Sequence, residues 1–292
     1  MNNLFNEIVN EIKRFLSKDP CNRMDTGEAD GKGHSPFDAA ERIWDEPLIG
    51  AARGDDSIFE TFHEFVDAAH WLPHEALASG GFAAKPDEVS VISWVLPQTK
   101  ATKDDNTKET TTPSERWARA RFFGEEANTK LRLHIAEFLN KNGVDTVSPV
   151  DLKDWKRVES GRFVIFSNWS ERHIAHACGL GTFALCDGLI TPVGKAARFG
   201  SVVLRARLSP TSRPYARYDE YCIYKTKKLC GVCIKRCPAG AISENGHDKR
   251  KCAAYLNDMA KVYTKEHFGF ATPACGFCQT GVPCASGIPG SK

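Results

Sequence analysis

The spacing of the cysteines constrains this chain more than any other feature. Eight of the eleven cysteines lie between residues 222 and 284. They include Cys230-x2-Cys233-x3-Cys237-Pro238, which is most of the bacterial ferredoxin run. Eight thiolates are what two four-iron, four-sulfur clusters require. The sequence therefore predicts two 4Fe-4S clusters in the C-terminal part of the chain.

The ferredoxin run also divides the eight ligands, because its cysteine before proline binds the other cluster. Lys227 occupies the place of the run's first cysteine, so we assign the nearest unused cysteine, Cys222, as the missing ligand. The first cysteine group is then Cys222, Cys230, Cys233 and Cys284, and the second cysteine group is Cys237, Cys252, Cys275 and Cys278.

Two other uses of these cysteines stay open. Zinc also binds Cys-x2-Cys pairs in tetrahedral sites, and a disulfide framework can be built from the same residues. The Cys-Pro run and the count of eight favour clusters. The first group is surrounded by basic residues, which either offset cluster charge, dock an acidic electron donor or form a solvated face: Lys225, Lys227, Lys228, Lys235 and Arg236.

Length and composition indicate a globular protein. The chain has 292 residues, of which 41% are hydrophobic and 26% charged, enough for one large domain and a small one. The net charge of +2 implies no strong polyelectrolyte partner. No apolar run approaches the ~20 residues of a membrane span, and the N-terminus has no secretory pattern. We therefore expect a cytoplasmic protein with reduced thiols and no membrane contact.

Helices and buried strands alternate in the first two thirds of the chain, which favours an α/β domain over residues 1–215 and a cluster domain over 216–292. Helices are expected over 2–17, from Ser35, from Ser57, over 114–142 with a break at Gly124 left open, and over 170–178. Strands are expected over 89–96, 162–167 and 200–205, and a loop over 98–113. The spacing of His63, His70 and His74 matches no metal motif, which favours surface or core-edge roles.

A glycine-rich motif lies near the centre of the chain. Gly179-x-Gly181-x-x-Ala184 fits the dinucleotide fingerprint, but a helical pattern precedes it where that fingerprint needs a strand. We interpret it as a helix end followed by a tight loop against which a flat group can lie.

Three segments around this motif resemble the superfamily of epoxyqueuosine reductases and reductive dehalogenases: Ser170–Gly181, Gly188–Pro192 and Arg198–Ser201. The cysteine module is similar too. The resemblance implies a nitroreductase-like α/β domain that binds a base-off corrinoid (cobalamin), followed by a ferredoxin-like domain that supplies electrons. It places the corrinoid against Gly179, Leu180, Gly181, Thr182, Gly188 and Gly200.

The chain departs from the family at the proton donor. Ile165 stands where epoxyqueuosine reductases have a catalytic Asp, and an aliphatic side chain delivers no proton. We expect His176 and His173 to take this role, with Ser170 and Glu171 as alternatives. The sequence also ends eight residues after Cys284, without the tRNA-binding extension of many family members. An ordinary epoxyqueuosine reductase is therefore not expected.

Three functions remain open at this point. The leading hypothesis is a corrinoid-dependent reductase of a small or tRNA-borne organic substrate, which takes electrons from a ferredoxin or flavodoxin. The second is an electron-transfer or activase protein that reduces the corrinoid or metal centre of a partner protein. The third is a flavin-dependent reductase. Apart from tRNA, no nucleic-acid partner is expected.

The assignment of Cys222 gives a first test. Cys222→Ala should convert or destroy one 4Fe-4S cluster and leave the other intact, because only one group loses a thiolate. Electron paramagnetic resonance of the reduced, reconstituted protein distinguishes the two clusters. Two unchanged 4Fe-4S signals in this variant would show that another ligand completes the first group.

Overall fold

The computed structural model describes residues 2–24, 37–38, 40–160 and 164–290. Its central sheet has the strand order β1-β2-β8-β3, and each neighbouring pair is antiparallel. The strands of this sheet are β1 (Leu48–Arg53), β2 (Ser90–Pro97), β3 (Thr146–Val147) and β8 (Ala197–Leu204). All eight residues of β2 are buried, so helices must cover both faces of the sheet.

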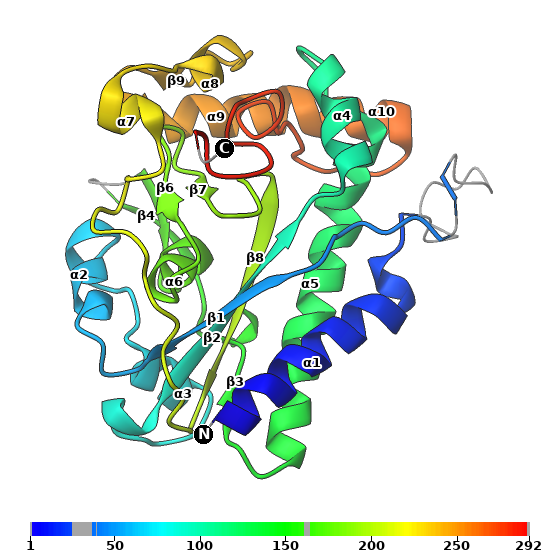
Figure 1. Cartoon of the computed structure of the whole chain (residues 1–292). Helices are drawn as coiled ribbons and strands as arrows, with labels where there is room; N and C mark the ends of the chain where they lie inside the picture. Colours follow the sequence, from blue (N-terminus) through cyan, green and yellow to red (C-terminus); the bar gives the residue numbers. More distant parts are fainter. Residues whose placement is uncertain (1, 25–36, 39, 161–163, 291–292) are drawn as a thin grey trace.

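Alternate side chains of β2 belong to two different cores, as the period of a strand requires. Ile92, Trp94 and Leu96 pack with α1 (Asn2–Lys18) and α5 (Glu115–Lys141). Val91 and Val95 face the opposite side, where the core is completed by α2 (Ile58–Phe65), α3 (Pro73–Ser79) and α6 (Glu171–Ala177). Figure 1 shows the sheet between these two helical layers.

The other elements are short and lie mainly at one end of the sheet. The helices are α4 (Lys100–Lys108), α7 (Ile223–Lys227), α8 (Val232–Lys235), α9 (Lys249–Tyr255) and α10 (Lys261–Phe268), with helical turns η1 (Pro20–Asn22), η2 (Pro86–Glu88), η3 (Pro149–Asp151) and η4 (Leu256–Ala260). Three two-stranded sheets pair β4 (Arg157–Ser160) with β5 (Val164–Ser167), β6 (Thr182–Phe183) with β7 (Leu189–Ile190), and β9 (Ile242–Ser243) with β10 (Gly246–His247).

The cysteine-rich segment lies across one end of the central sheet, drawn from yellow to red in Figure 1. Backbone hydrogen bonds attach it to the turn before β8: Lys195 N donates to Cys284 O at 2.8 Å, and Ala196 N donates to Ala285 O at 3.3 Å. On its other side, Asn106 of α4 donates to Cys275 O at 3.1 Å. The sheet and α4 thus hold the segment at two separate points.

Most of the expected elements are confirmed. The N-terminal helix is α1, the segments 89–96 and 200–205 lie in β2 and β8, and the helix over 170–178 is α6. The segment 114–142 is one unbroken helix, α5, because the ring of Trp44 packs directly against Gly124. The start of the expected helix at Ser35 lies outside the described residues. The chain is a mixture of helices and strands, as expected. The domain boundaries and the nitroreductase-like and ferredoxin-like labels stay predictions.

Two expectations about individual elements were wrong. Residues 98–113 were expected to form a loop, but they contain α4, whose Thr99 side chain accepts from Thr102 N at 3.3 Å. The buried face of this helix consists of polar residues such as Asn106. Its sequence therefore shows no apolar stripe from which a helix could be predicted. The strand 162–167 was expected to be central, but β5 pairs with β4 in a separate sheet. None of the helices within the described residues has the length and apolar character needed to cross a membrane.

The fold predicts a large stability effect at Asn128, which links α5 to two strands. Its Oδ1 accepts from Trp94 Nε1 and its Nδ2 donates to Phe199 O, both at 2.9 Å and fully buried. Asn128→Ala leaves both groups unsatisfied and should cost about 1–3 kcal/mol of unfolding free energy. Chemical denaturation measures it. The exposed Asn142→Ala should change stability by less than about 0.5 kcal/mol. Equal losses in the two variants would show that the two bonds of Asn128 contribute nothing beyond a surface contact.

Candidate functional site

A cavity of about 520 Å³, here called the central cavity, lies where β5, α6 and β8 meet α9. Its size is within the usual range for sites of small molecules and cofactors. Aromatic side chains form much of its wall: Phe65, Trp155, Phe166, Trp169 and Phe199. Ile165 of β5 also lines it.

The central cavity is rich in cations. Five lining side chains are Lys or Arg: Arg157, Arg172, Lys195, Arg198 and Lys249. Among the described residues, two lining side chains are carboxylates, and Glu125 is already paired with Arg198 at 2.6 Å. The charge of Arg198, together with burial, lowers the pKa of the neighbouring Arg121 to about 9. The positive potential of this region favours an anionic ligand or an anionic group on a larger ligand.

The first cysteine group is gathered in one place. Cys222, Cys230, Cys233 and Cys284 all line a single hollow, whose other walls include Tyr224, Val282 and Ile190. These cysteines come from three elements: the start of α7, the turn into α8 and the C-terminal loop. The structure thus brings together the four residues that the sequence assigned to one cluster.

The second cysteine group lies beside the central cavity. The pKa of Cys275 is raised to about 12, mainly by burial and also by the nearby Cys252 and Cys237. Cys252, on α9, lines the central cavity itself. Cys278 lies next to a ninth cysteine, Cys186, whose Sγ approaches the Cys278 carbonyl. Sequence reasoning assigned no role to Cys186.

Cys186 is paired with a buried lysine. Lys195 Nζ donates to Cys186 Sγ at 3.1 Å, and only 2% of Lys195 is exposed. Hydrogen bonds from Cys233 and Cys278 lower the pKa of the Cys186 thiol, and the Lys195 charge adds to this effect. Burial alone would lower the pKa of Lys195, but the thiolates of Cys186, Cys284 and Cys278 raise it instead. Lys195 is therefore a charged ammonium next to both cysteine groups.

The two histidines expected to donate protons occupy different environments. His173 lines the central cavity, and its Nδ1 lies 2.8 Å from Ser170 Oγ. Burial lowers the pKa of His173 well below its usual value, so the ring is neutral. His176 lies one helical turn further along α6, away from the cavity wall. It donates from Nδ1 to Gly181 O at 2.7 Å and stacks on Tyr215.

The residues expected to contact a corrinoid are mostly covered by the protein itself. A Cβ on Gly179 would collide with the Ser212 carbonyl, and one on Gly181 with the Ile190 carbonyl. Leu180 is in the core, Thr182 is buried, and Gly200 lies under Trp94. Of these positions, Gly188 alone lines the central cavity. Close packing within the chain accounts for the other glycines, and their contact with a cofactor remains only a prediction.

Glu171 is a buried acid in the wall of the central cavity, at the first position of α6. Both of its carboxyl oxygens are buried, and neither has a hydrogen-bond partner within 3.5 Å among the residues that the structure describes. Burial raises its pKa from 4.5 to about 7, against the lowering effects of Arg132 and the Ser201 hydroxyl. Glu125 and Asp151 face the same group and also raise its pKa. The carboxyl is therefore partly protonated at neutral pH.

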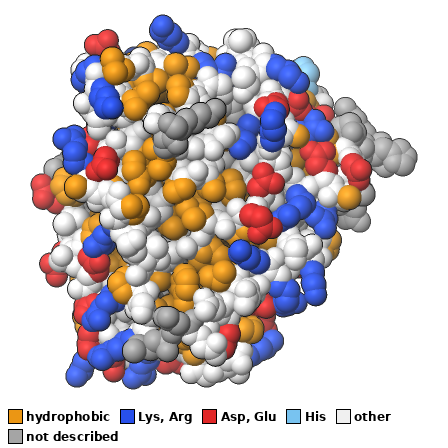
Figure 2. All heavy atoms as spheres, in the orientation of Figure 1, with side chains coloured by type: hydrophobic (Ala, Val, Ile, Leu, Met, Phe, Trp, Pro, Cys, Tyr) orange, Lys and Arg blue, Asp and Glu red, His pale blue; other side chains and the backbone are white. Residues whose placement is uncertain are grey.

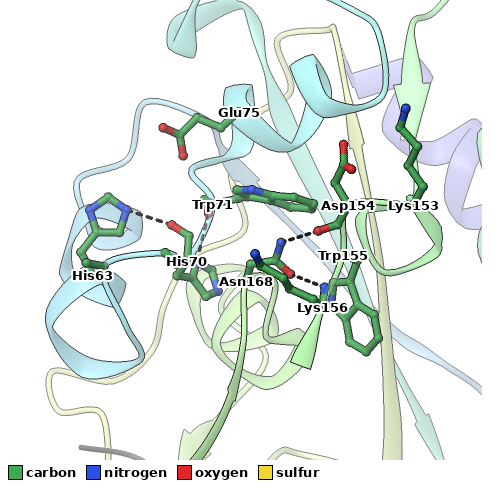
Figure 3. Close-up of a pocket in the computed structure, with 11 residues that line it drawn as sticks. His63, His70, Trp71, Glu75, Lys153, Asp154, Trp155, Lys156 and Asn168 are labelled. Atoms are coloured by element: carbon green, nitrogen blue, oxygen red, sulfur yellow. Dashed lines mark hydrogen bonds between the residues drawn. The ribbon is translucent and has the colours of Figure 1, made fainter. Parts of the chain in front are cut away.

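A second cavity, of about 800 Å³, lies beside the turn between α2 and α3. Figure 3 shows that His63 points to the carbonyl of His70, to which its Nε2 donates at 2.9 Å. His70 Nδ1 donates to Trp71 O, and its Nε2 accepts from Ser170 N. Burial lowers the pKa of His70 to about 4. Both ring nitrogens of a neutral His70 are thus used inside the protein, so this ring holds α6 in place and is no metal ligand.

The surface carries charges of both signs. Figure 2 shows Lys and Arg interspersed with Asp and Glu around a band of apolar side chains on one face. On that face neither sign forms a continuous patch, in keeping with the net charge of +2. Within the described residues, no three His, Cys, Asp or Glu side chains converge closely enough to hold a single metal ion.

No family model matches the chain, and no curated protein matches it. Its fold, however, is similar to that of solved reductases. A catabolic reductive dehalogenase matches over 94% of this chain and 35% of its own, with 15% identity and a TM-score of 0.50. An epoxyqueuosine reductase from Bacillus subtilis matches over 99% of this chain and 67% of its own, with 16% identity and a TM-score of 0.48. The enzyme from Streptococcus thermophilus matches over 98% and 66%, with 14% identity and a TM-score of 0.49.

The resemblance expected from the sequence is therefore confirmed at the level of the fold. The chain spans about a third of the dehalogenase and two thirds of the epoxyqueuosine reductases. Sequence reasoning missed Cys186, Lys195 and the other cavity cations. The one sequence feature that could have linked Cys186 to Lys195 is their separation of nine residues.

The raised pKa of Glu171 predicts a pH-dependent change in stability. Between pH 4.5 and about 7 the folded state holds a proton that the unfolded state releases, so this contribution to stability falls as pH rises and levels off above pH 7. Glu171→Gln should melt like wild type near pH 5 and roughly 2–4 °C higher at pH 8, the shift for about 1 kcal/mol.

Thermal unfolding at the two pH values provides the measurement. Glu64→Gln removes an exposed carboxyl of α2 and is the matched control. Its melting temperature should differ from that of wild type by the same amount at both pH values. A Glu171→Gln protein that melts below wild type at pH 8 would show that the buried carboxylate is stabilising.

Proposed function

We propose that this protein is an iron–sulfur reductase in which two 4Fe-4S clusters deliver electrons to an organic substrate in the central cavity. The observation that carries the proposal is the position of Cys252, which belongs to the second cysteine group and also lines the cavity. A cluster at this group would lie against the reaction space. The first group, in the neighbouring hollow, would receive electrons from a donor protein.

The donor set fits such clusters. Each group has four cysteines, and the first is assembled around one hollow. A zinc ion would need all four sulfurs about 2.3 Å from one point, whereas a four-iron cluster carries each thiolate on a separate iron. Eight cysteines in two groups of four are the number of thiolates that two such clusters need. A buried lysine beside them supports an anionic occupant.

We also propose a corrinoid at the central cavity, whose volume of about 520 Å³ is large enough for only part of such a group. When bound, a corrinoid supplies a strongly reducing metal centre. Trp155 and Phe199 would lie against such a group and exclude water, and Arg157 and Arg198 would hold its anionic parts. A flavin has a similar shape and charge, so a flavin-dependent reductase is the alternative. The absorption spectrum of the reconstituted protein distinguishes a bound flavin from a bound corrinoid.

Reduction of an organic substrate also consumes protons, which the chain must supply. Ile165 cannot supply one. Glu171 holds a proton near neutral pH and lines the cavity, as does the neutral ring of His173. The missing Asp makes a substrate other than epoxyqueuosine in tRNA the preferred proposal, with a small organic molecule such as a halogenated compound as the candidate.

The electron donor would bind near the first cysteine group. Leu229, directly before Cys230, is 75% exposed, and Lys227 and Lys228 beside it are exposed cations. An exposed apolar side chain ringed by positive charge suits an acidic ferredoxin or flavodoxin. The same surface also serves the second candidate function, an activase that passes electrons on to a partner's metal centre. The fold match to a catabolic reductive dehalogenase supports the reductase.

The test is anaerobic reconstitution with iron, sulfide and cobalamin. We expect about eight iron and eight sulfide per chain, together with the absorption of a base-off corrinoid. Conversion of epoxyqueuosine-containing tRNA should not occur. Stoichiometric zinc without visible charge-transfer absorption would overturn the clusters, and a flavin band would replace the corrinoid. Turnover of the tRNA at the rate of a genuine family enzyme, run as a control, would overturn the proposed substrate class.

A further inference from the structure

Lys195 is the most deeply buried cation between the cysteine groups. It lines the central cavity and the hollow of the first cysteine group at the same time. Its Nζ contacts Cys186 Sγ at 3.1 Å, and no carboxylate in the described part of the chain pairs with it. Burying an ammonium costs several kcal/mol unless anions surround it. Here the neighbouring sulfur atoms, and not a carboxylate, must supply the negative charge.

The surrounding thiols identify that anion by its chemistry. The Lys195 ammonium interacts electrostatically with Cys186, Cys284 and Cys278. Cys284 belongs to the first cysteine group and Cys278 to the second. Four thiolates make an iron–sulfur cluster negative as a whole, and an added electron makes it more so. A fixed cation at this point stabilises the reduced form of either cluster more than the oxidised form.

The backbone around Lys195 keeps its side chain in this position. Gly194, with φ of +95°, forms the turn, and a Cβ there would collide with Ala285. Lys195 N donates to Cys284 O at 2.8 Å, so the residue is attached to the loop of the first cysteine group. The side chain then passes over Gly188, where a Cβ would come within 2.7 Å of Lys195 Cδ. The absence of a side chain at Gly188 leaves room for this path.

We propose that Lys195, held by Cys186, is the built-in counter-cation of the two clusters and raises their reduction potentials, so that electrons reach the central cavity. This inference rests on the proposed function, since it needs the clusters. Each cluster takes up one electron from the donor, with no bond formed or broken and no proton taken up. The anionic group recognised by Lys195 is thus the thiolate-ligated cluster itself.

The test compares Lys195→Met with Lys227→Met in reconstituted full-length protein. Both changes remove one positive charge, but Lys227 is exposed, so water screens its charge. Redox titration followed by electron paramagnetic resonance gives the ratio of reduced to oxidised cluster. At a fixed potential, Lys195→Met should lower this ratio at least tenfold, equal to about 59 mV for one electron. Lys227→Met should change it less than twofold.

Iron and sulfide content separates the outcomes. Wild-type protein that binds neither would overturn the proposed function and this inference together. Both clusters present, with equal potentials in Lys195→Met and Lys227→Met, would overturn the role of Lys195 alone. If Lys195→Met does not fold, Gly188→Ala provides the test, because its methyl group displaces the lysine from Cys186 without removing charge. A threefold or larger fall in the reduced fraction supports the proposal, and an unchanged fraction overturns it.

Discussion

The attachment of the cysteine-rich segment to the central sheet is the interaction on which the site depends. Two backbone hydrogen bonds join the turn before β8 to Cys284 and Ala285. They place Cys284 in the first cysteine group and Lys195 between the two groups. Because the turn continues directly into a strand buried on both faces, the rigidity of the sheet is passed on to the cysteines. Under the proposed function, this connection would keep the cysteine groups at a fixed separation from the central cavity.

The cavity concentrates positive charge inside the protein. Burying several arginines and lysines together destabilises a fold unless anions neutralise their charge. Glu125 neutralises Arg198, and Asp151 pairs with Arg132 at 2.8 Å. The remaining cations line the central cavity. Under the proposed function, an anionic occupant would neutralise them, and the stability lost in the empty protein would be exchanged for affinity, as is common at functional sites.

The sequence predicted the parts of this structure that are encoded locally. The cysteine groups follow from spacing, and β2 follows from a β-branched run. Helix α4 could not be recognised, since its buried face consists of Thr102 and Asn106, which make hydrogen bonds in place of apolar contacts. The cavity cations come from segments far apart in the chain. In the sequence alone, none of them can be distinguished from an ordinary surface residue. His173 and His176 look equivalent on one helix, and only the tertiary structure shows which of them meets the cavity.

The loop that holds Cys275 and Cys278 bears on how the protein matures. The ring of Trp117 packs against Gly276, and Asn106 donates to Thr280 Oγ1 at 3.0 Å, so α4 and α5 shape this loop through contacts that involve no metal. The protein interior offsets the ordering entropy of this loop without any metal. A zinc finger, by contrast, folds only when its metal binds. Under the proposed function, iron and sulfide would therefore enter a loop that is already shaped, and the assembly machinery would act on a folded protein and not on a nascent, extended chain.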